Sequence, residues 1–322
     1  MEIYRSDDCG GKMEERKMIT GNKLERYLER CEEGRKPITA EVFLSDRCNL
    51  KCQYCRYGHS SGKVMEYRDF VMYAARLVEM GVKGIILTGG GEPTTCPDFQ
   101  RICWWLERNG IPYGVNTNGI MPIMCDARFI KVSLDTGNSE RYKEIRGRDK
   151  LEHVINNIAD MVHWRDNGHE GTRIGVQCVA TDRDDVITFY ERVKCLGVDY
   201  IYLRPLEGVN VKRVSETEVK EWLGEARMKD ERLVLSFKFG LTGYRSPWCM
   251  ANWSVITVDV DGNVPYCCHR PEEIIGNVMD LNIMEKKINY HADMRKCETP
   301  CRLSGANKYL DDMRTDKEWF FV

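Results

Sequence analysis

The chain has 322 residues, of which 42% are hydrophobic, and its 48 basic and 50 acidic side chains give a formal net charge of −2. This balance excludes a strongly basic chain, so we expect no nucleic-acid partner. The sequence has no apolar run of about eighteen residues and no apolar segment near its start, so we expect no membrane association and a cytoplasmic location.

Residues 1–38 are polar and predict an N-terminal extension with a helix around residues 24–31. Short runs rich in branched and aromatic residues follow, and each run is bounded by turn residues, as strands are. Apolar residues at helical spacing separate these runs, and Ser215 with Glu218 forms a capping-box pattern for a further helix. The expected strands are residues 40–45, 84–88, 113–117, 129–134, 173–180 and 200–204. Alternating strands and helices predict an α/β fold with a parallel sheet, either open or part of a βα barrel.

The pattern changes after about residue 240. Residues 253–260 and 264–267 predict two strands of a hairpin around Asp261-Gly262-Asn263. We therefore expect three parts: an extension over 1–38, a main domain over 39–240 and a small C-terminal domain over 241–322.

Fifteen cysteines are an odd number, and in a reducing compartment so many indicate metal or redox chemistry. Three of them, Cys48, Cys52 and Cys55, fall within eight residues directly after the first expected strand. Three thiolates leave one iron of a four-iron cluster open for chemistry. A zinc site completed by His59 is the alternative.

The CxxxCxxC spacing, with Tyr54 before its third cysteine, resembles the radical S-adenosylmethionine (SAM) superfamily. The next strand ends in Gly89-Gly90-Gly91-Glu92-Pro93, which is similar to the GGEP motif of that family. Glycines allow the backbone to approach a ligand, and Glu92 can accept a hydrogen bond from an amine. The resemblance implies a partial (βα)6 TIM-type barrel, and a [4Fe–4S] cluster whose open iron binds SAM. One electron from that cluster would cleave SAM to a 5′-deoxyadenosyl radical, which abstracts a hydrogen atom from the substrate.

The resemblance also implies that polar residues at the strand ends contact SAM. Ser133 corresponds to the position that contacts the ribose, and Arg146 to a partner of the SAM carboxylate. For each single residue the alternative is a polar group that caps a loop. The expected cofactor-binding residues are Tyr54, Gly89, Gly90, Gly91, Glu92, Asn116, Ser133, Arg146, Gln177 and Arg204.

A second cysteine group follows the pattern Cys249-x12-Gly262-x4-Cys267, with Cys297 and Cys301 later in the chain. This spacing resembles the twitch and SPASM auxiliary domains of radical SAM enzymes. Four cysteines match the single [4Fe–4S] cluster of a twitch-like domain, built from a β-hairpin and a helix. A zinc ribbon with the same sulfurs is the alternative, and Cys268 could replace one of the four ligands.

We expect a radical SAM oxidoreductase that oxidises or dehydrogenates a small molecule, such as a sugar, an aminocyclitol or a nucleotide-like compound. The auxiliary cluster would accept the electron, and a flavodoxin- or ferredoxin-like protein would donate electrons to the SAM cluster. A radical epimerase is an alternative, in which Cys178 or Cys268 would donate hydrogen. A peptide-modifying enzyme is another, although only about forty residues precede the barrel. A non-catalytic iron–sulfur or zinc scaffold is the alternative of a different class.

Overall fold

An eight-stranded sheet forms the frame of the computed structural model, which describes residues 34–57, 61–208, 211–241, 244–297 and 300–315. The helix expected at residues 24–31 lies outside the described residues. All strand pairings in this sheet are parallel, in the order β7-β6-β5-β4-β3-β2-β1-β8. Its strands are β1 (Thr39–Phe43), β2 (Gly84–Thr88), β3 (Tyr113–Thr117), β4 (Phe129–Ser133), β5 (Arg173–Ala180), β6 (Tyr200–Pro205), β7 (Leu233–Leu235) and β8 (Val255–Val258).

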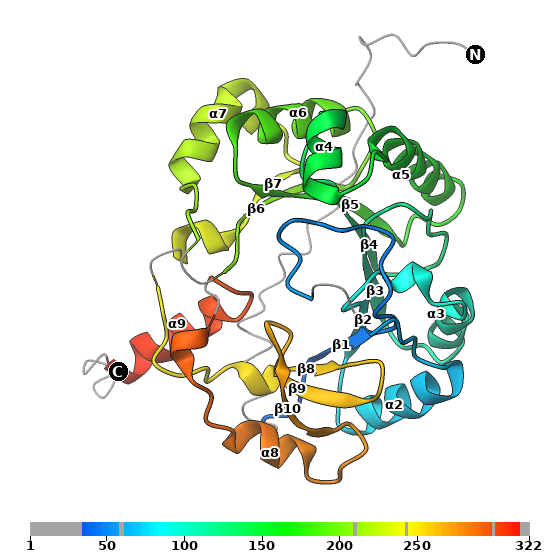
Figure 1. Ribbon diagram of the computed structural model, residues 1–322, viewed down its shortest axis with the longest axis vertical. Coiled ribbons are helices and arrows are strands. Elements are labelled where there is room, and N and C mark those ends of the chain that lie inside the picture. Colours follow the sequence, from blue (N-terminus) through cyan, green and yellow to red (C-terminus); the bar gives the residue numbers. More distant parts are fainter. Residues whose placement is uncertain (1–33, 58–60, 209–210, 242–243, 298–299, 316–322) are drawn as a thin grey trace.

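Helices cover the outer face of this curved sheet (Figure 1). They pack there because every second strand residue is apolar and points outward, as Val132, Val176 and Leu203 do with no exposed surface. The helices bury Phe70, Ile102 and other large residues against them, so the core lies between the two layers. The helices on this face are α2 (Tyr67–Glu79), α3 (Phe99–Arg108), α4 (Ser139–Arg146), α5 (Leu151–Asp166), α6 (Arg183–Val193) and α7 (Glu216–Met228). Two more, α8 (Ile283–Asn289) and α9 (Ser304–Thr315), belong to the C-terminal part, where α8 contacts β10 and α9 follows Cys301.

The expected fold class, an α/β protein with a partial TIM-type barrel, is confirmed, but the sheet has eight strands where the sequence predicts six. The additional β7 has only three residues, which is too short for a hydrophobic pattern to reveal. The additional β8 comes from the C-terminal part and pairs with β1, with Thr39 opposite Val255 and Val42 opposite Val258. The division near residue 240 stays a prediction, and the pairing of β8 with β1 joins the parts on either side of it.

The expected hairpin between residues 253–260 and 264–267 is wrong. The turn forms, because the Asp259 side chain accepts hydrogen bonds from the amides of Asp261 and Asn263, and Gly262 adopts a φ of 81°. The strands on either side of it then diverge, since β8 joins β1. Strand β9 (Asn263–Cys267) pairs instead with β10 (Arg270–Asn277) in an antiparallel two-stranded sheet. The hairpin of the C-terminal part therefore lies one strand later than expected.

The C-terminal part lies beside both edges of the main sheet. Strand β8 is one edge, and β7, the other edge, leads into the 3-10 helix η2 (Phe237–Leu241), which contacts α9. Figure 1 shows β9, β10 and α9 below and to the left of the barrel opening. The C-terminal part, which carries the later cysteines, therefore borders the barrel opening.

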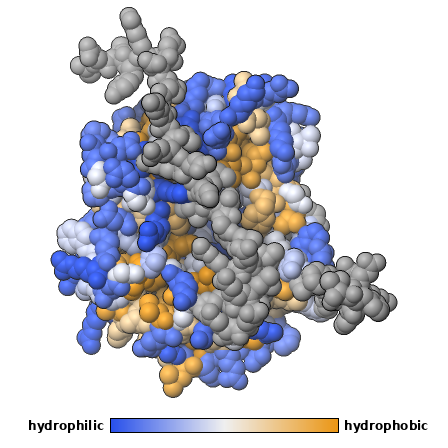
Figure 2. All heavy atoms as spheres, turned by 180° about the vertical axis from the view of Figure 1, so that it is seen from behind, coloured by the Kyte–Doolittle hydropathy of each residue, from blue (hydrophilic) through white to orange (hydrophobic). Residues whose placement is uncertain are grey.

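The surface mixes hydrophilic and hydrophobic side chains. Figure 2 shows the molecule from behind, where hydrophilic residues predominate along the edge and hydrophobic residues lie between them. No helix in the described parts of the chain has both the length and the apolar character that crossing a membrane requires. The cytoplasmic location and the absence of a nucleic-acid partner stay predictions.

Candidate active site and auxiliary cysteine site

The loop after β1 carries Cys48, Cys52 and Cys55, and two neighbouring segments hold it. The amides of Lys51 and Gln53 donate to the carbonyls of Arg146 and Ile145, at 3.0 and 2.9 Å, at the end of α4. On its other side, the amides of Gly91 and Glu92 donate to the carbonyls of Ser45 and Arg47. These backbone contacts fix the cysteine loop between the glycine-rich turn after β2 and the end of α4.

The glycines of that turn are required by close packing against the cysteine loop. A Cβ on Gly91 would lie 2.0 Å from the carbonyl oxygen of Arg47, and a Cβ on Gly90 would lie 2.8 Å from the carboxylate of Asp46. A Cβ on Gly89 would lie 2.6 Å from the carbonyl of Gly91. The turn therefore admits no larger residue without moving the cysteine loop.

The three thiols fit a cluster that is partly open to solvent. Cys48 and Cys55 are exposed, and Cys52 is half-buried. Arg146 donates from Nη1 to the Cys52 sulfur at 3.3 Å, and the Asn118 amide lies 4.0 Å from the Cys48 sulfur. Burial, and the negative charges of Glu92 and the other two thiolates, raise the pKa of Cys48, although a backbone hydrogen bond opposes them. A positively charged metal group beside these sulfurs would favour their thiolate forms.

Glu92 is buried between the ends of β2 and β3. One carboxylate oxygen accepts hydrogen bonds from the hydroxyls of Thr94 and Thr117, at 2.8 and 2.7 Å. The other carboxylate oxygen accepts a hydrogen bond from the backbone amide of Asn118 at 2.8 Å. Burial raises the pKa of Glu92, and these hydrogen bonds reduce the shift. The contact with the SAM amine stays a prediction, and the structure adds that Glu92 joins the two strand ends.

Arg146 links the cysteine loop to the end of β4. Its Nη2 forms a buried ion pair with Asp135 at 2.6 Å while Nη1 contacts the Cys52 sulfur. Asp135 has a φ of 71°, a strained backbone for a residue other than glycine, and its carboxylate accepts a bond from the Val179 amide at 3.0 Å. The expected contact of Arg146 with the SAM carboxylate stays a prediction.

The expected strand-end residues lie on the inner face of the barrel. Ser133 on β4 is the register neighbour of Gln177 on β5, and Arg204 on β6 follows at the rim. Unpartnered buried polar atoms lie near them, namely Tyr54 Oη, Asn116 Oδ1 and Arg146 Nε. A bound ligand with donors and acceptors would satisfy these atoms, so this rim fits a polar cofactor such as SAM.

Cys178 lies on the other face of β5. It is fully buried in the hydrophobic core with Val176, and its thiol donates to the Asp135 carbonyl at 3.1 Å. Gln177, its neighbour, has the opposite orientation in the strand. The expectation that Cys178 faces the cavity is therefore corrected. Its role as hydrogen donor has no support from this placement.

The second cysteine group converges although its members are far apart in sequence. Cys249 precedes the 3-10 helix η3 (Asn252–Ser254), Cys267 ends β9, Cys297 follows the 3-10 helix η4 (Met294–Lys296) and Cys301 precedes α9. One cavity is lined by all four, together with Cys268 and His269. No three His, Cys, Asp or Glu side chains of the described residues are grouped closely enough to hold a single metal ion. The four sulfurs surround a space instead.

Hydrogen-bond donors point at these sulfurs. Asn307 donates to Cys249 at 3.3 Å, and the Leu303 amide donates to Cys301 at 3.4 Å. Burial, followed by repulsion among the thiolates, raises the pKa of Cys249 and of Cys297 to about 12. A cationic metal group would offset both effects, and donors of this kind stabilise cluster sulfurs. The site therefore fits an iron–sulfur cluster.

Cys268 lines the same cavity but contacts the barrel wall. Arg302 Nη2 lies 3.4 Å from its sulfur, and Tyr57 Oη donates to its carbonyl at 2.5 Å. Arg302 also forms a bidentate ion pair with Glu41 on the inner face of β1. Through these contacts Cys268 lies between the auxiliary cysteines and the loop that carries Cys55.

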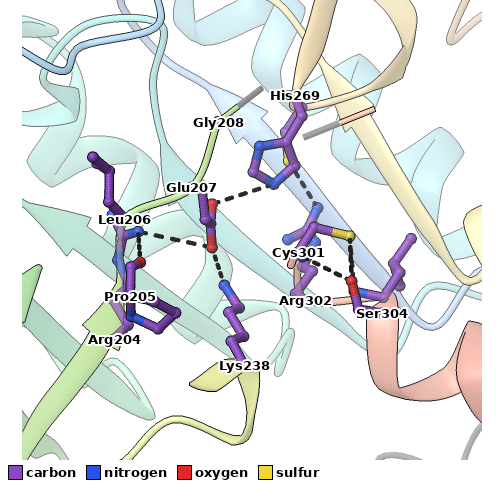
Figure 3. Close-up of polar contacts among 12 residues, drawn as sticks. Arg204, Pro205, Leu206, Glu207, Gly208, Lys238, His269, Cys301, Arg302 and Ser304 are labelled. Carbon is purple, nitrogen blue, oxygen red and sulfur yellow. Dashed lines mark hydrogen bonds and ion pairs between the residues drawn. The ribbon is translucent and has the colours of Figure 1, made fainter. Parts of the chain in front are cut away.

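A cluster of charged side chains, which the sequence did not predict, joins the end of β6 to the C-terminal part (Figure 3). Glu207, after β6, pairs with Lys238 and lies 3.7 Å from Arg204 and 3.6 Å from His269. Burial raises the pKa of Glu207, but the positive charges of Lys238 and Arg204 lower it by more than burial raises it. The pKa of Glu207 therefore lies well below its usual range. Burial lowers the pKa of His269 to about 4. These residues form a polar wall between the end of β6 and the auxiliary cavity, which His269 lines.

The fold and the cysteine loop define the class of protein. Residues 42–163 match the model of the Radical SAM superfamily, so this part of the chain is a radical SAM domain. A radical SAM domain implies a [4Fe–4S] cluster and SAM as cofactors.

The chain is also similar to individual proteins of known name and to a solved structure. The chain is 27% identical to the mitochondrial GTP 3′,8-cyclase of Arabidopsis thaliana, over 75% of this chain and 70% of the relative. It is 24% identical to a probable GTP 3′,8-cyclase of Saccharolobus islandicus, over 77% and 88%. The structure of Streptococcus suis SuiB bound to S-adenosylmethionine superimposes with a TM-score of 0.65, covering 87% of this chain and 77% of SuiB, at 13% identity. This last likeness shows the fold.

Proposed function

We propose that the protein is a two-cluster radical SAM enzyme that oxidises a small polar molecule held between its two cysteine sites. The observation that carries this proposal is the convergence of Cys249, Cys267, Cys297 and Cys301 around one cavity beside the barrel interior.

In this proposal, different residues of the chain bind the two clusters and orient SAM. Cys48, Cys52 and Cys55 would hold the first cluster, and the rim with Asn116 and Ser133 would orient SAM. When bound, the cluster and SAM supply a 5′-deoxyadenosyl radical that removes one hydrogen atom from the substrate. The second cluster, on the four later cysteines, would accept one electron, and one proton would leave to solvent, so the substrate loses two hydrogens in total. A flavodoxin- or ferredoxin-like protein would supply the reducing electron.

The polar wall supports a polar substrate. Glu207, Lys238 and His269 lie between the barrel rim and the auxiliary cavity, and Arg302 reaches both Glu41 and Cys268. Charged side chains in a protected position give orientation through directed hydrogen bonds. A sugar, an aminocyclitol or a nucleotide-like compound offers hydroxyl and amine groups that such a wall can bind.

A second candidate is a rearrangement of a nucleotide, which the two relatives named GTP 3′,8-cyclase favour. This reaction would use the same polar wall but would end without net oxidation. The proposed oxidation differs from it because oxidation leaves one electron on the second cluster in every turnover.

The test uses anaerobically reconstituted protein with dithionite, SAM and either GTP or fractionated small metabolites. We expect about eight iron atoms per chain, in two four-iron clusters. A substrate should increase 5′-deoxyadenosine formation, and a deuterated substrate should transfer deuterium to it. A product two hydrogens lighter supports oxidation, whereas an isomer of GTP supports the second candidate. Zinc in place of the second four irons would contradict the two-cluster proposal.

A further inference from the structure

Lys287, on α8, is a buried lysine that contacts two residues of the auxiliary cavity's lining, Asn252 and Tyr266. Its side chain is 2% exposed and lies one helical turn after the buried Ile283. Its ammonium donates to the Tyr266 carbonyl at 2.7 Å and to the Asn252 side-chain oxygen at 3.3 Å. Among the described residues, no carboxylate lies within ion-pair distance of it. The charge of Lys287 is therefore bound only by neutral oxygens.

Such a charge is costly unless another charge offsets it, because an unpaired ion inside a protein loses its hydration. Burial lowers the pKa of Lys287 to about 8, and the thiolates of Cys267 and Cys249 act against this by favouring the protonated lysine. Both hydrogen-bond acceptors belong to the segments that carry these cysteines. Tyr266 directly precedes Cys267, and Asn252 follows Cys249 by three residues. Lys287 thus ties the two segments together under the sulfurs.

The other buried cations of this region already have carboxylate partners. Arg302 pairs with Glu41, and Arg270 pairs with Glu273. Their charges are largely neutralised locally. Lys287 is different, since its ammonium has no acidic partner among the described residues.

We propose that Lys287 is the counter-charge of the auxiliary cluster and raises its reduction potential, so that the cluster accepts an electron readily. This inference rests on the proposed function, because it requires the second cluster. A cluster bound by four thiolates is anionic and becomes more negative on reduction. A nearby positive charge in a medium of low dielectric constant stabilises the reduced form more than the oxidised form.

The test compares Lys287→Met with wild type and with Lys286→Met. Lys286 is the matched control, since it is the adjacent lysine of α8 and forms a surface ion pair with Asp280 at 2.8 Å. The measurement is a redox titration followed by electron paramagnetic resonance, in which the two clusters are monitored separately. We expect the Lys287→Met protein to show a lower potential for the auxiliary cluster, by about tenfold in the reduction equilibrium, or ~59 mV for one electron. The SAM cluster should not change, and neither should Lys286→Met.

An unchanged auxiliary potential in iron-loaded Lys287→Met would overturn the inference. If this variant loses the second cluster, Lys287→Gln is measured, because it keeps a donor and removes the charge. A lowered potential in Lys287→Gln supports the inference, and a wild-type potential overturns it. If both neutral variants lose only the second cluster, its recovery in Lys287→Arg supports the counter-charge, and failure to recover overturns it. A wild type without a second iron cluster would instead refute the proposed function itself.

Discussion

The two cysteine sites of this protein differ in how the chain assembles them. The first takes three sulfurs from one short loop, in which Cys48 and Cys55 are exposed. The second takes four sulfurs from widely separated segments and surrounds them with protein, including the buried Lys287. A local loop can present its ligands as soon as its two flanking segments are in place. The second site exists only when the C-terminal part has folded against the barrel, so its assembly depends on the whole fold.

The largest effect is expected from removing the first site. A protein with Cys48, Cys52 and Cys55 changed to Ala should lose about four of its eight irons. It should produce no 5′-deoxyadenosine, because SAM has no iron to bind. Its melting temperature should stay close to that of the iron-loaded wild type, since it keeps the second cluster and backbone hydrogen bonds fix the loop. Formation of 5′-deoxyadenosine by this variant under dithionite would show that the cysteine loop is not the radical-generating site.

Removing the second site should separate SAM cleavage from product formation. With Cys249, Cys267, Cys297 and Cys301 changed to Ala, the protein should keep about four irons and still cleave SAM. It should form no oxidised product, because the substrate radical has no electron acceptor. The melting temperature should fall further than in the first variant, since the binding energy of a buried metal site is folding energy. Iron analysis, calorimetry and product analysis test this, and full product yield would refute the auxiliary role.

A smaller effect is expected from Arg146→Met, which removes the donor to the Cys52 sulfur. Loss of a residue that orients a metal ligand lowers metal affinity or activity by roughly 10- to 100-fold. The first cluster should therefore lose iron faster to a chelator, while the second should be unaffected. Arg141→Met is the matched control on α4, because Arg141 pairs with Asp185 and Glu144. Equal iron loss in both variants would mean that Arg146 has no special relation to Cys52.

The last prediction concerns the dependence of folding stability on pH at the polar wall, and no change in either cluster is expected. The pKa of Glu207 lies below its usual value because Lys238 and Arg204, with His269 beside them, outweigh the effect of burial. Its ion pairs therefore stabilise the fold above about pH 4.5, and this contribution is lost as the pH falls further. Glu207→Gln should cost about 3 kcal/mol of unfolding free energy at pH 7.

Urea unfolding at several pH values tests this prediction. The difference between wild type and Glu207→Gln should shrink as the pH falls below about 4.5. Glu225→Gln, on an exposed position of α7, is the control. A difference that grows in acid would show that the sign of the linkage is reversed.

The sequence predicted the first site better than the second, for a physical reason. Six of the strands and the loop with Cys48, Cys52 and Cys55 follow from short-range patterns, because the ligands and their strand are contiguous. The later cysteines could be grouped only by resemblance, and the contacts that surround them could not be predicted. Glu207 and His269 meet through tertiary packing, which no local spacing records.

One error and one omission have particular causes. The turn at Gly262 carries a hairpin signal, but β8 pairs with the free edge of β1, and a distant partner of this kind leaves no local trace. Lys287 follows the buried Ile283 by four residues on a short helix, so a lysine occupies a core-facing position. That mismatch was a usable signal for a functional residue, because a charge in the core is costly without a purpose.

The pairing of β8 with β1 has a consequence for any attempt to study the barrel alone. A chain cut near residue 240 would lose β8 and leave the amides and carbonyls of β1 without a neighbour along one side. An exposed edge of this kind is a template for pairing with another chain. Such a fragment should therefore self-associate or precipitate, even though the cysteine loop and the glycine-rich turn would still be present. By pairing with β1 through β8, the C-terminal part thus also prevents the strand before the cysteine loop from pairing with another chain.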